Sequence, residues 1–221
     1  MVAVKQQSTK LDKIKTRAIM AFRTREDRGH HSGFSGGQPF NYSGGTKNLG
    51  EANEPKPAGL EVNASGIPQE LKALDQWVDW KFKFDESRKK KWTKVPVSPA
   101  TGRFAKSTDP STWATFDEAW AYYQSRKGRG IDGLGFMFSK ADPFTGIDLD
   151  DCRNPETGVI QPWALEIVEG MDSFTELSPS GEGLHIFVKG ELQGDGMNTE
   201  EIEMYDSKRY FTVTGQVYDA F

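Results

Sequence analysis

From Ile67 onward the chain is a succession of short apolar segments, each long enough for one strand or one short helix and each followed by turn residues. Residues 77–84 alternate large apolar and polar side chains, which is typical of a half-buried strand, and residues 92–97 return after a charged turn as a hairpin partner. The sequence from Thr115 to Glu118 is a capping box, and it opens a helix with an apolar face. Hairpin strands interspersed with single helices predict an α+β domain.

The remaining segments follow the same two patterns. Helices are expected at residues 69–74 and 162–171, and strands at 133–138, at the segment that carries Asp148 and Asp150, and at 175–177, 184–189, 201–205 and 210–214.

Residues 1–66 differ in composition from this folded part. Thr9 to Arg28 carries seven basic residues around apolar ones. It is either a short amphipathic helix that contacts nucleic acid or a partner, or a solvated charged tail. From His30 to Gly66 the chain is rich in Gly, Ser, Asn and Pro, and such a stretch buries too little apolar surface to offset its ordering entropy. We therefore expect a flexible, partly basic segment at 1–66 and one folded domain at 67–221.

Composition excludes several classes of protein. Apolar residues make up 36% of the 221 residues, and neither a bilayer-spanning run nor the apolar core of a secretory signal is present. We expect no membrane association and a cytoplasmic location. Cys152 is the single cysteine, and with three histidines in the chain a structural zinc site is not expected. The net charge of −4 does not by itself indicate nucleic-acid binding.

The first candidate site lies in the sequence Gly146 to Asp151. On a strand, Asp148 and Asp150 project from the same face while Ile147 and Leu149 point into the core. Two carboxylates so close together are most easily accommodated by a shared cation, and Mg²⁺ or Mn²⁺ with substrate phosphates fits best. The alternative is that Asp150 and Asp151 simply begin a polar loop.

Three further strands or turns carry polar groups that could contribute to the same site. His185 follows a loop whose small residues Ser180, Gly181 and Gly183 allow close backbone approach, so free N–H groups there could cradle a phosphate. Lys94 either holds a phosphate or is one more solvated lysine. Glu203 alternates with apolar neighbours and so points to the polar face of its strand. A lone histidine is more often structural than functional, but these groups occur together.

The order Asp148-x-Asp150, Gly183-Leu184-His185 and Glu203 resembles the three motifs of the archaeo-eukaryotic primase superfamily. The longer strings look like the primase-polymerase (prim-pol) domains of phage and plasmid replication proteins, and the resemblance extends from about Ile67 to Gly215. These strings are KVPVSPATG, STDPSTWATFDEA, GIDLDDC, LSPSGEGLHIFVKG and IEMYDSKRYFTVTG.

This resemblance implies a catalytic core with an RRM-like mixed sheet flanked by helices, extending DNA or RNA from (d)NTPs. By position, Asp148, Asp150 and Glu203 would bind two divalent ions, with Asp206 as the alternative third acid. The triphosphate would be held by the residues Lys94, Ser180, Gly181, Gly183, His185 and Arg209. The implied partners are a single-stranded DNA template and primer, and a separate helicase or other replication protein in a bacterial host or phage-infected cell.

Three functions remain open from sequence. The first is a template-directed DNA polymerase or primase that uses two metal ions. The second is a non-catalytic nucleic-acid- or protein-binding module on a primase-derived fold, in which the basic N-terminal segment would be the working part. The third is a metal-dependent nuclease, since the same carboxylates can activate water.

Overall fold

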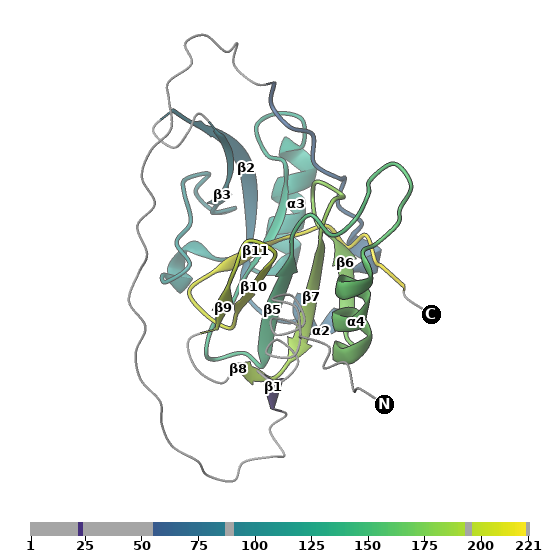
Figure 1. The fold of residues 1–221 in the computed structure, drawn as a ribbon. Helices are drawn as coiled ribbons and strands as arrows, with labels where there is room; N and C mark the ends of the chain where they lie inside the picture. The colour runs from purple at the N-terminus through teal and green to yellow at the C-terminus, as the bar shows by residue number, and fades with distance from the viewer. Residues whose placement is uncertain (1–21, 24–54, 87–90, 193–195, 220–221) are drawn as a thin grey trace, which may run out of the picture.

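The computed structural model describes residues 22–23, 55–86, 91–192 and 196–219, and strands dominate this part of the chain (Figure 1). The helices are α2 (Gln69–Lys72), α3 (Phe116–Arg126) and α4 (Pro162–Met171). The strands are β1 (Phe22–Arg23), β2 (Trp77–Asp85), β3 (Lys91–Val97), β4 (Gly133–Met137), β5 (Phe144–Leu149), β6 (Phe174–Leu177), β7 (Leu184–Lys189), β8 (Glu191–Leu192), β9 (Met197–Asn198), β10 (Ile202–Tyr205) and β11 (Tyr210–Val213).

These strands form one five-stranded sheet in the order β6-β7-β5-β10-β9 and one four-stranded sheet in the order β11-β4-β2-β3, while β1 pairs with β8. All pairings between these strands are antiparallel. The α+β class is therefore confirmed. The primase resemblance implies a mixed sheet, whereas the described residues form two large antiparallel sheets and the short β1–β8 pair.

Most of the predicted elements are present. The three predicted helices correspond to α2, α3 and α4, and both hydrogen bonds of the Thr115–Glu118 capping box are formed. The short strands β8 and β9 were not expected. Phe22 and Arg23, for which the sequence left open a basic helix or a solvated tail, form β1 against Glu191 and Leu192. The other residues of that basic segment, and the linker up to residue 54, lie outside the described residues.

The packed part of the chain begins before the predicted boundary at Ile67. Val62 is buried, the Leu60 N–H donates to the carbonyl of Pro179, and the Asn63 N–H donates to the carbonyl of Thr214. Composition alone placed residues 60–66 in the linker. Backbone hydrogen bonds to segments more than 100 residues later in the chain hold them against the domain, and composition does not report such contacts.

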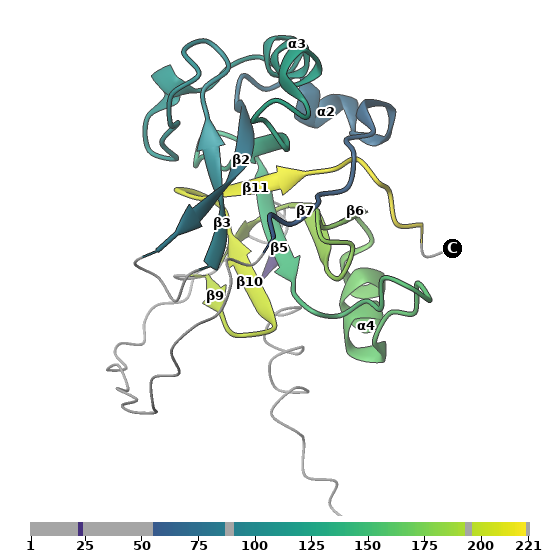
Figure 2. The same cartoon turned by 90° about the horizontal axis from the view of Figure 1, so that it is seen from above.

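Aromatic side chains join the two large sheets. Phe187 of β7 stacks on Phe138 at a centroid distance of 5.7 Å, and Phe138 meets Phe211 of β11 edge-on at 5.0 Å. A Cβ at Gly146 would lie 2.5 Å from both the Phe138 and the Phe211 ring, so only glycine permits this approach of β5. Figure 2 shows β11 crossing the middle of the molecule between α3 and α4.

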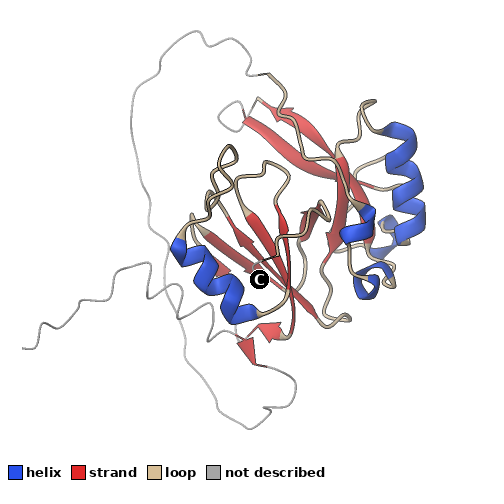
Figure 3. Ribbon diagram, turned by 90° about the vertical axis from the view of Figure 1, so that its right-hand side faces the viewer, coloured by secondary structure: helices blue, strands red, loops and turns tan. Residues whose placement is uncertain are grey.

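A second apolar cluster lies on the other face of the five-stranded sheet. Helix α4 contributes Trp163, Ala164, Ile167 and Val168, which pack with Ile147, Leu149, Leu184, Ile186, Ile202 and Met204. The strands thus lie between α4 on one side and α2 and α3 on the other (Figure 3). Among the described residues, no helix combines the length and the apolar character needed to cross a membrane.

One acidic side chain is buried in the four-stranded sheet without a hydrogen-bond partner among the described residues. Asp79 of β2 is 0% exposed, and neither carboxylate oxygen has a hydrogen-bond partner among the described residues. Burial raises the pKa of the Asp79 carboxyl to about 8. Near pH 7 the folded protein therefore keeps this group largely protonated, whereas in the unfolded chain it ionises near pH 4.

We predict that Asp79→Asn stabilises the protein at neutral pH. A group whose pKa is raised on folding opposes folding increasingly as the pH rises from the unfolded value near 4 to the folded value of about 8. The gain at pH 7 should be on the order of 2–4 kcal/mol, and it should vanish below about pH 4. Urea unfolding of both proteins across this pH range measures it. An equal difference at every pH would show that Asp79 keeps its ordinary pKa.

Candidate active site

Four ionisable side chains lie in one row across the five-stranded sheet. In the antiparallel register Asp148 of β5 is directly opposite His185 of β7 on one side and Glu203 of β10 on the other. His185 is in turn opposite Glu176 of β6. Directly opposed residues point to the same face and have Cβ atoms about 5 Å apart. This face is the one that carries Phe187 and packs against the four-stranded sheet.

His185 lies between two carboxylates in the interior. Its Nε2 is 3.6 Å from Oδ1 of Asp148, and its Nδ1 is 3.4 Å from Oε1 of Glu176. The ring is 2% exposed and rests against Phe211 at a centroid distance of 5.0 Å. Burial opposes a charged imidazole, but the charges of Asp148 and Glu176 outweigh it and raise the pKa of His185. The sequence placed His185 on a polar face, and the second sheet covers that face.

Glu176 is a site residue that sequence analysis missed. It is fully buried, and its carboxylate accepts hydrogen bonds from the backbone N–H groups of Thr214 and Gly215. These donors stabilise the negative charge and hold the carboxylate beside Nδ1 of His185. In the sequence Glu176 stands between Thr175 and Leu177 like any polar strand residue. The one available signal was its position opposite His185 in the predicted pair of strands.

Asp150 follows directly after β5, and the charges of nearby acids affect its pKa. Burial, then the charges of Asp148 and Glu203, raise the pKa of Asp150 to about 6, while His185 and Lys94 act in the opposite direction. The Oδ1 atom of Asp148 is buried and accepts no hydrogen bond from a described residue. Asp148, Asp150, Glu203, His185 and Lys94 are therefore close enough to influence one another, and the carboxylates are not fully neutralised.

The two candidates for the third acid lie in different surroundings. Glu203 is opposite Asp148, and one of its oxygens accepts a hydrogen bond from the Tyr205 hydroxyl at 2.9 Å. Asp206 instead forms an ion pair with Lys140, and its charge adds to the burial that raises the pKa of Asp142. Asp206 thus belongs to a separate polar group, and Glu203 is the acid that lies next to Asp148.

The loop before His185 is closed by its own hydrogen bonds. The N–H of Gly181 donates to the Ser178 carbonyl, that of Glu182 to the Ser180 hydroxyl, and that of Gly183 to the Ser178 hydroxyl. The free amides expected from the sequence are therefore engaged at these three positions. Nucleotide binding by Ser180, Gly181 and Gly183 stays a prediction, and it would depend on the Ser180 hydroxyl and nearby cations more than on amides.

Three cations surround this loop and the acid row. Lys94 of β3 is exposed, and Arg209 lies over the Tyr205 ring at 4.9 Å. Arg153, not predicted from sequence, donates to the Gly181 carbonyl at 2.7 Å and so supports the loop. The charge of Lys94 acts on His185 and Asp150, whereas Arg209 lies beside Tyr205, which donates to Glu203.

A divalent ion fits the chemistry of the acid row. Among the residues that the structure describes, no group of three or more Asp, Glu, His or Cys side chains is arranged to hold a metal ion as it stands. However, Oδ1 of Asp148 accepts no hydrogen bond from a described residue, and the pKa of Asp150 is raised first by burial and then by the charges of Asp148 and Glu203, a repulsion that a cation would relieve. Asp148, Asp150 and Glu203 are the side chains that would supply its ligands.

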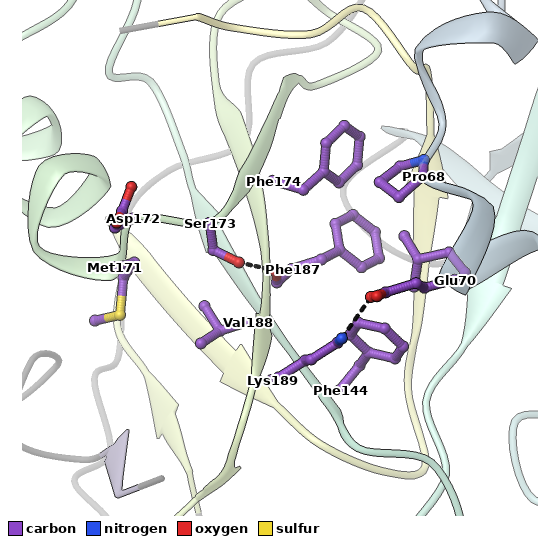
Figure 4. A pocket seen from close by; sticks show the side chains of 11 residues that line it. Pro68, Glu70, Phe144, Met171, Asp172, Ser173, Phe174, Phe187, Val188 and Lys189 are labelled. Atoms are coloured by element: carbon purple, nitrogen blue, oxygen red, sulfur yellow. Dashed lines mark hydrogen bonds and ion pairs between the residues drawn. The ribbon is translucent and has the colours of Figure 1, made fainter. Parts of the chain in front are cut away.

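A separate pocket of about 490 Å³ lies between α2 and the strands β6 and β7. Figure 4 shows Phe144, Phe174 and Phe187 lining it, with a Lys189–Glu70 ion pair beside them. None of the predicted site residues lines this pocket.

Comparison with known proteins bears on the chain as a whole and not on single site residues. The chain is 40% identical over 161 residues to a DNA primase-polymerase of Nitratiruptor phage NrS-1. The chain contains a domain related to phage primase-polymerase. The match covers 67% of this chain and 21% of the phage protein, so the prim-pol-like domain spans about one fifth of its relative. No protein-family model matches the chain.

We predict that Glu176→Gln destabilises the prim-pol-like domain. The amide would turn an N–H group toward the N–H groups of Thr214 and Gly215 or toward His185, and at least one buried donor would lose its acceptor. The expected cost is about 2 kcal/mol, measured by thermal or urea unfolding. Glu182→Gln, at an exposed position of the neighbouring loop, is the matched control and should be neutral. Equal stability of both variants would contradict a role for Glu176 in holding this network.

Proposed function

We propose that the domain is a template-directed DNA polymerase or primase that transfers nucleotides from (d)NTPs. The observation that carries this proposal is the row Glu176–His185–Asp148–Glu203 across four neighbouring strands, with Asp150 beside it. The similarity to the phage primase-polymerase supports the same reaction class. On this proposal the domain acts in phage or plasmid replication, in the cytoplasm of a bacterial host or phage-infected cell.

The carboxylates would bind Mg²⁺ or Mn²⁺ through Asp148, Asp150 and Glu203. When bound, two such ions lower the pKa of the primer 3′-hydroxyl and stabilise the charge of the leaving pyrophosphate. The chain's own contribution is to hold these acids in fixed register next to His185. The archaeo-eukaryotic primase core fold is part of this proposal.

His185 would bind a phosphate oxygen of the incoming nucleotide. Glu176 lies next to Nδ1 and so orients the ring, while Nε2 faces the carboxylate of Asp148 and would donate to an anion only once a cation takes up that carboxylate. The side chain of Asp148 next to Nε2 would turn to the cation when one is present. Lys94 and Arg209 would neutralise part of the remaining triphosphate charge, and a single-stranded template with its primer would complete the substrate set.

We expect the protein to extend a labelled primer on a single-stranded template with dNTPs or NTPs and Mn²⁺ or Mg²⁺. Asp148→Ala/Asp150→Ala should reduce extension at least about 10³-fold, because both groups act on the transition state. Incubation of the same DNA without nucleotides tests for nuclease activity. If the folded wild type shows no extension with either metal and either nucleotide type, the non-catalytic binding module becomes the better interpretation.

The third acid can be assigned without an activity assay. Mn²⁺ should raise the melting temperature of the wild type, because a ligand that binds only the folded state stabilises it. Glu203→Gln should reduce this shift by more than half, whereas Asp206→Asn, which removes the Lys140 pair, should leave it unchanged. Differential scanning fluorimetry with and without the ion measures both variants. The opposite order would assign the metal site to Asp206.

A further inference from the structure

The hairpin of β2 and β3 carries an exposed aromatic ring flanked by lysines. Phe104, which forms a bridge to Val97 beside β3, is 54% exposed. The Nζ atoms of Lys81 and Lys83 lie 5.4 and 5.2 Å from the centroid of its ring. We name these three side chains the Phe104 platform.

The strand register places the platform on one face of the hairpin. Lys81 is opposite Val95 and Lys83 is opposite Thr93, so both lysines share the face of Val97, to which Phe104 is bridged. Among the described residues, no Asp or Glu forms an ion pair with Lys81 or Lys83. The part of the chain that the structure describes thus provides no ion-pair partner for either lysine, and the Phe104 ring beside them is 54% exposed.

This combination fits one class of ligand. An exposed ring offers a flat apolar surface on which a nucleobase can stack, and ammonium groups on either side can contact the phosphates that precede and follow that base. In a duplex the bases stack on one another, so none is available to stack on the Phe104 ring. The other exposed large apolar residues, Val159 and Val217, carry no ring.

The platform and the candidate active site meet opposite faces of this hairpin. Lys94 is opposite Phe82 and lies three residues before Val97, so its side chain projects from the face opposite the platform, roughly 10 Å along the strand. Its charge acts on both Asp150 and His185. A strand bound at Phe104 would therefore have to cross the edge of the hairpin to reach the acid row.

We propose that the Phe104 platform binds single-stranded DNA and holds the template strand outside the acid row, on the face of the hairpin opposite Lys94. The identification of that strand as template rests on the proposed polymerase function. Binding itself requires only the ring and the two lysines. A base stacks on Phe104, and Lys81 and Lys83 shift from their places over the ring to neighbouring phosphates.

The test is fluorescence anisotropy with a labelled oligothymidylate of ~15 nucleotides at salt concentrations from ~50 to ~200 mM, without nucleotides or divalent ions. Phe104→Ala should weaken binding about tenfold, whereas Phe104→Trp, which retains a stacking surface, should bind like the wild type. Lys81→Gln/Lys83→Gln should reduce the slope of log K against log salt by about 1.4, since each phosphate contact contributes about 0.7.

Lys72→Gln is the matched control. Lys72 also lies over a ring, at 5.0 Å from Phe116, but that ring is only 8% exposed and cannot accept a base. This variant should change neither affinity nor salt slope. Thermal unfolding of each variant confirms that the fold is intact, and the Trp variant keeps the test decisive if Ala destabilises the loop.

The proposal is overturned if Phe104→Ala binds within twofold of the wild type, or if it loses affinity for duplex and single strand equally. The first result would leave the ring as ordinary surface or a contact for another protein. Extension activity with unchanged binding in Phe104→Ala would reject the platform while the polymerase proposal stands. Loss of binding in a protein that never extends primers would support the platform and reject the polymerase.

Discussion

The register of β5 between β7 and β10 is the constraint on which the candidate site depends. A slip of one residue would turn Asp148 into the apolar cluster and place Ile147 in its position. Two features prevent this slip. Ile147 and Leu149 are packed under α4 on one face, and Gly146 on the other face admits the rings of Phe138 and Phe211. The acid row is therefore fixed by packing on both sides of the sheet.

The same packing gives the row its electrostatic character. Because the four-stranded sheet covers His185, water is excluded and charges act on one another at low effective dielectric. Glu176 is tolerated there since two backbone N–H groups and His185 surround its carboxylate. Asp148 has no comparable set of donors: its Oδ1 accepts no hydrogen bond from a described residue and lies 3.6 Å from Nε2 of His185, and its charge raises the pKa of the neighbouring Asp150. The hydrogen bonds thus distinguish Glu176, whose carboxylate is satisfied and positions His185, from Asp148, whose carboxylate can still bind a cation.

Much of the fold could be predicted from the sequence because its signals are local. The period-two pattern of Trp77 to Phe84 and the capping box at Thr115 each depend on residues a few positions apart, and both elements are formed. Alternation within each strand also predicts that Asp148, His185 and Glu203 point to the polar face of their strands. What alternation does not show is which strands become neighbours, and here three separate strands bring these residues together.

The unpredicted features all depend on distant contacts. Glu176 is buried because Thr214 and Gly215, 38 and 39 residues later, supply its donors. The segment around Val62 is ordered through Thr214 and Pro179, although its composition is typical of a linker. The burial of Asp79, in a strand whose pattern is otherwise regular, follows from neighbours on β3 and β4. In each case the role of the residue depends on a partner that is too distant in the sequence for a local pattern to reveal.

The engaged amides of the loop before His185 change how an anion could be held. A cradle of free N–H groups would have made the loop sufficient on its own, but Gly181, Glu182 and Gly183 already donate within it. Positive charge must then come from side chains on other elements: Arg153, which donates to the Gly181 carbonyl, and Lys94 of β3, whose charge acts on His185. Lys94 belongs to the four-stranded sheet and His185 to the five-stranded one. An anion bound between them would connect the two sheets, so we expect nucleotide binding and the stability of the sheet interface to be coupled.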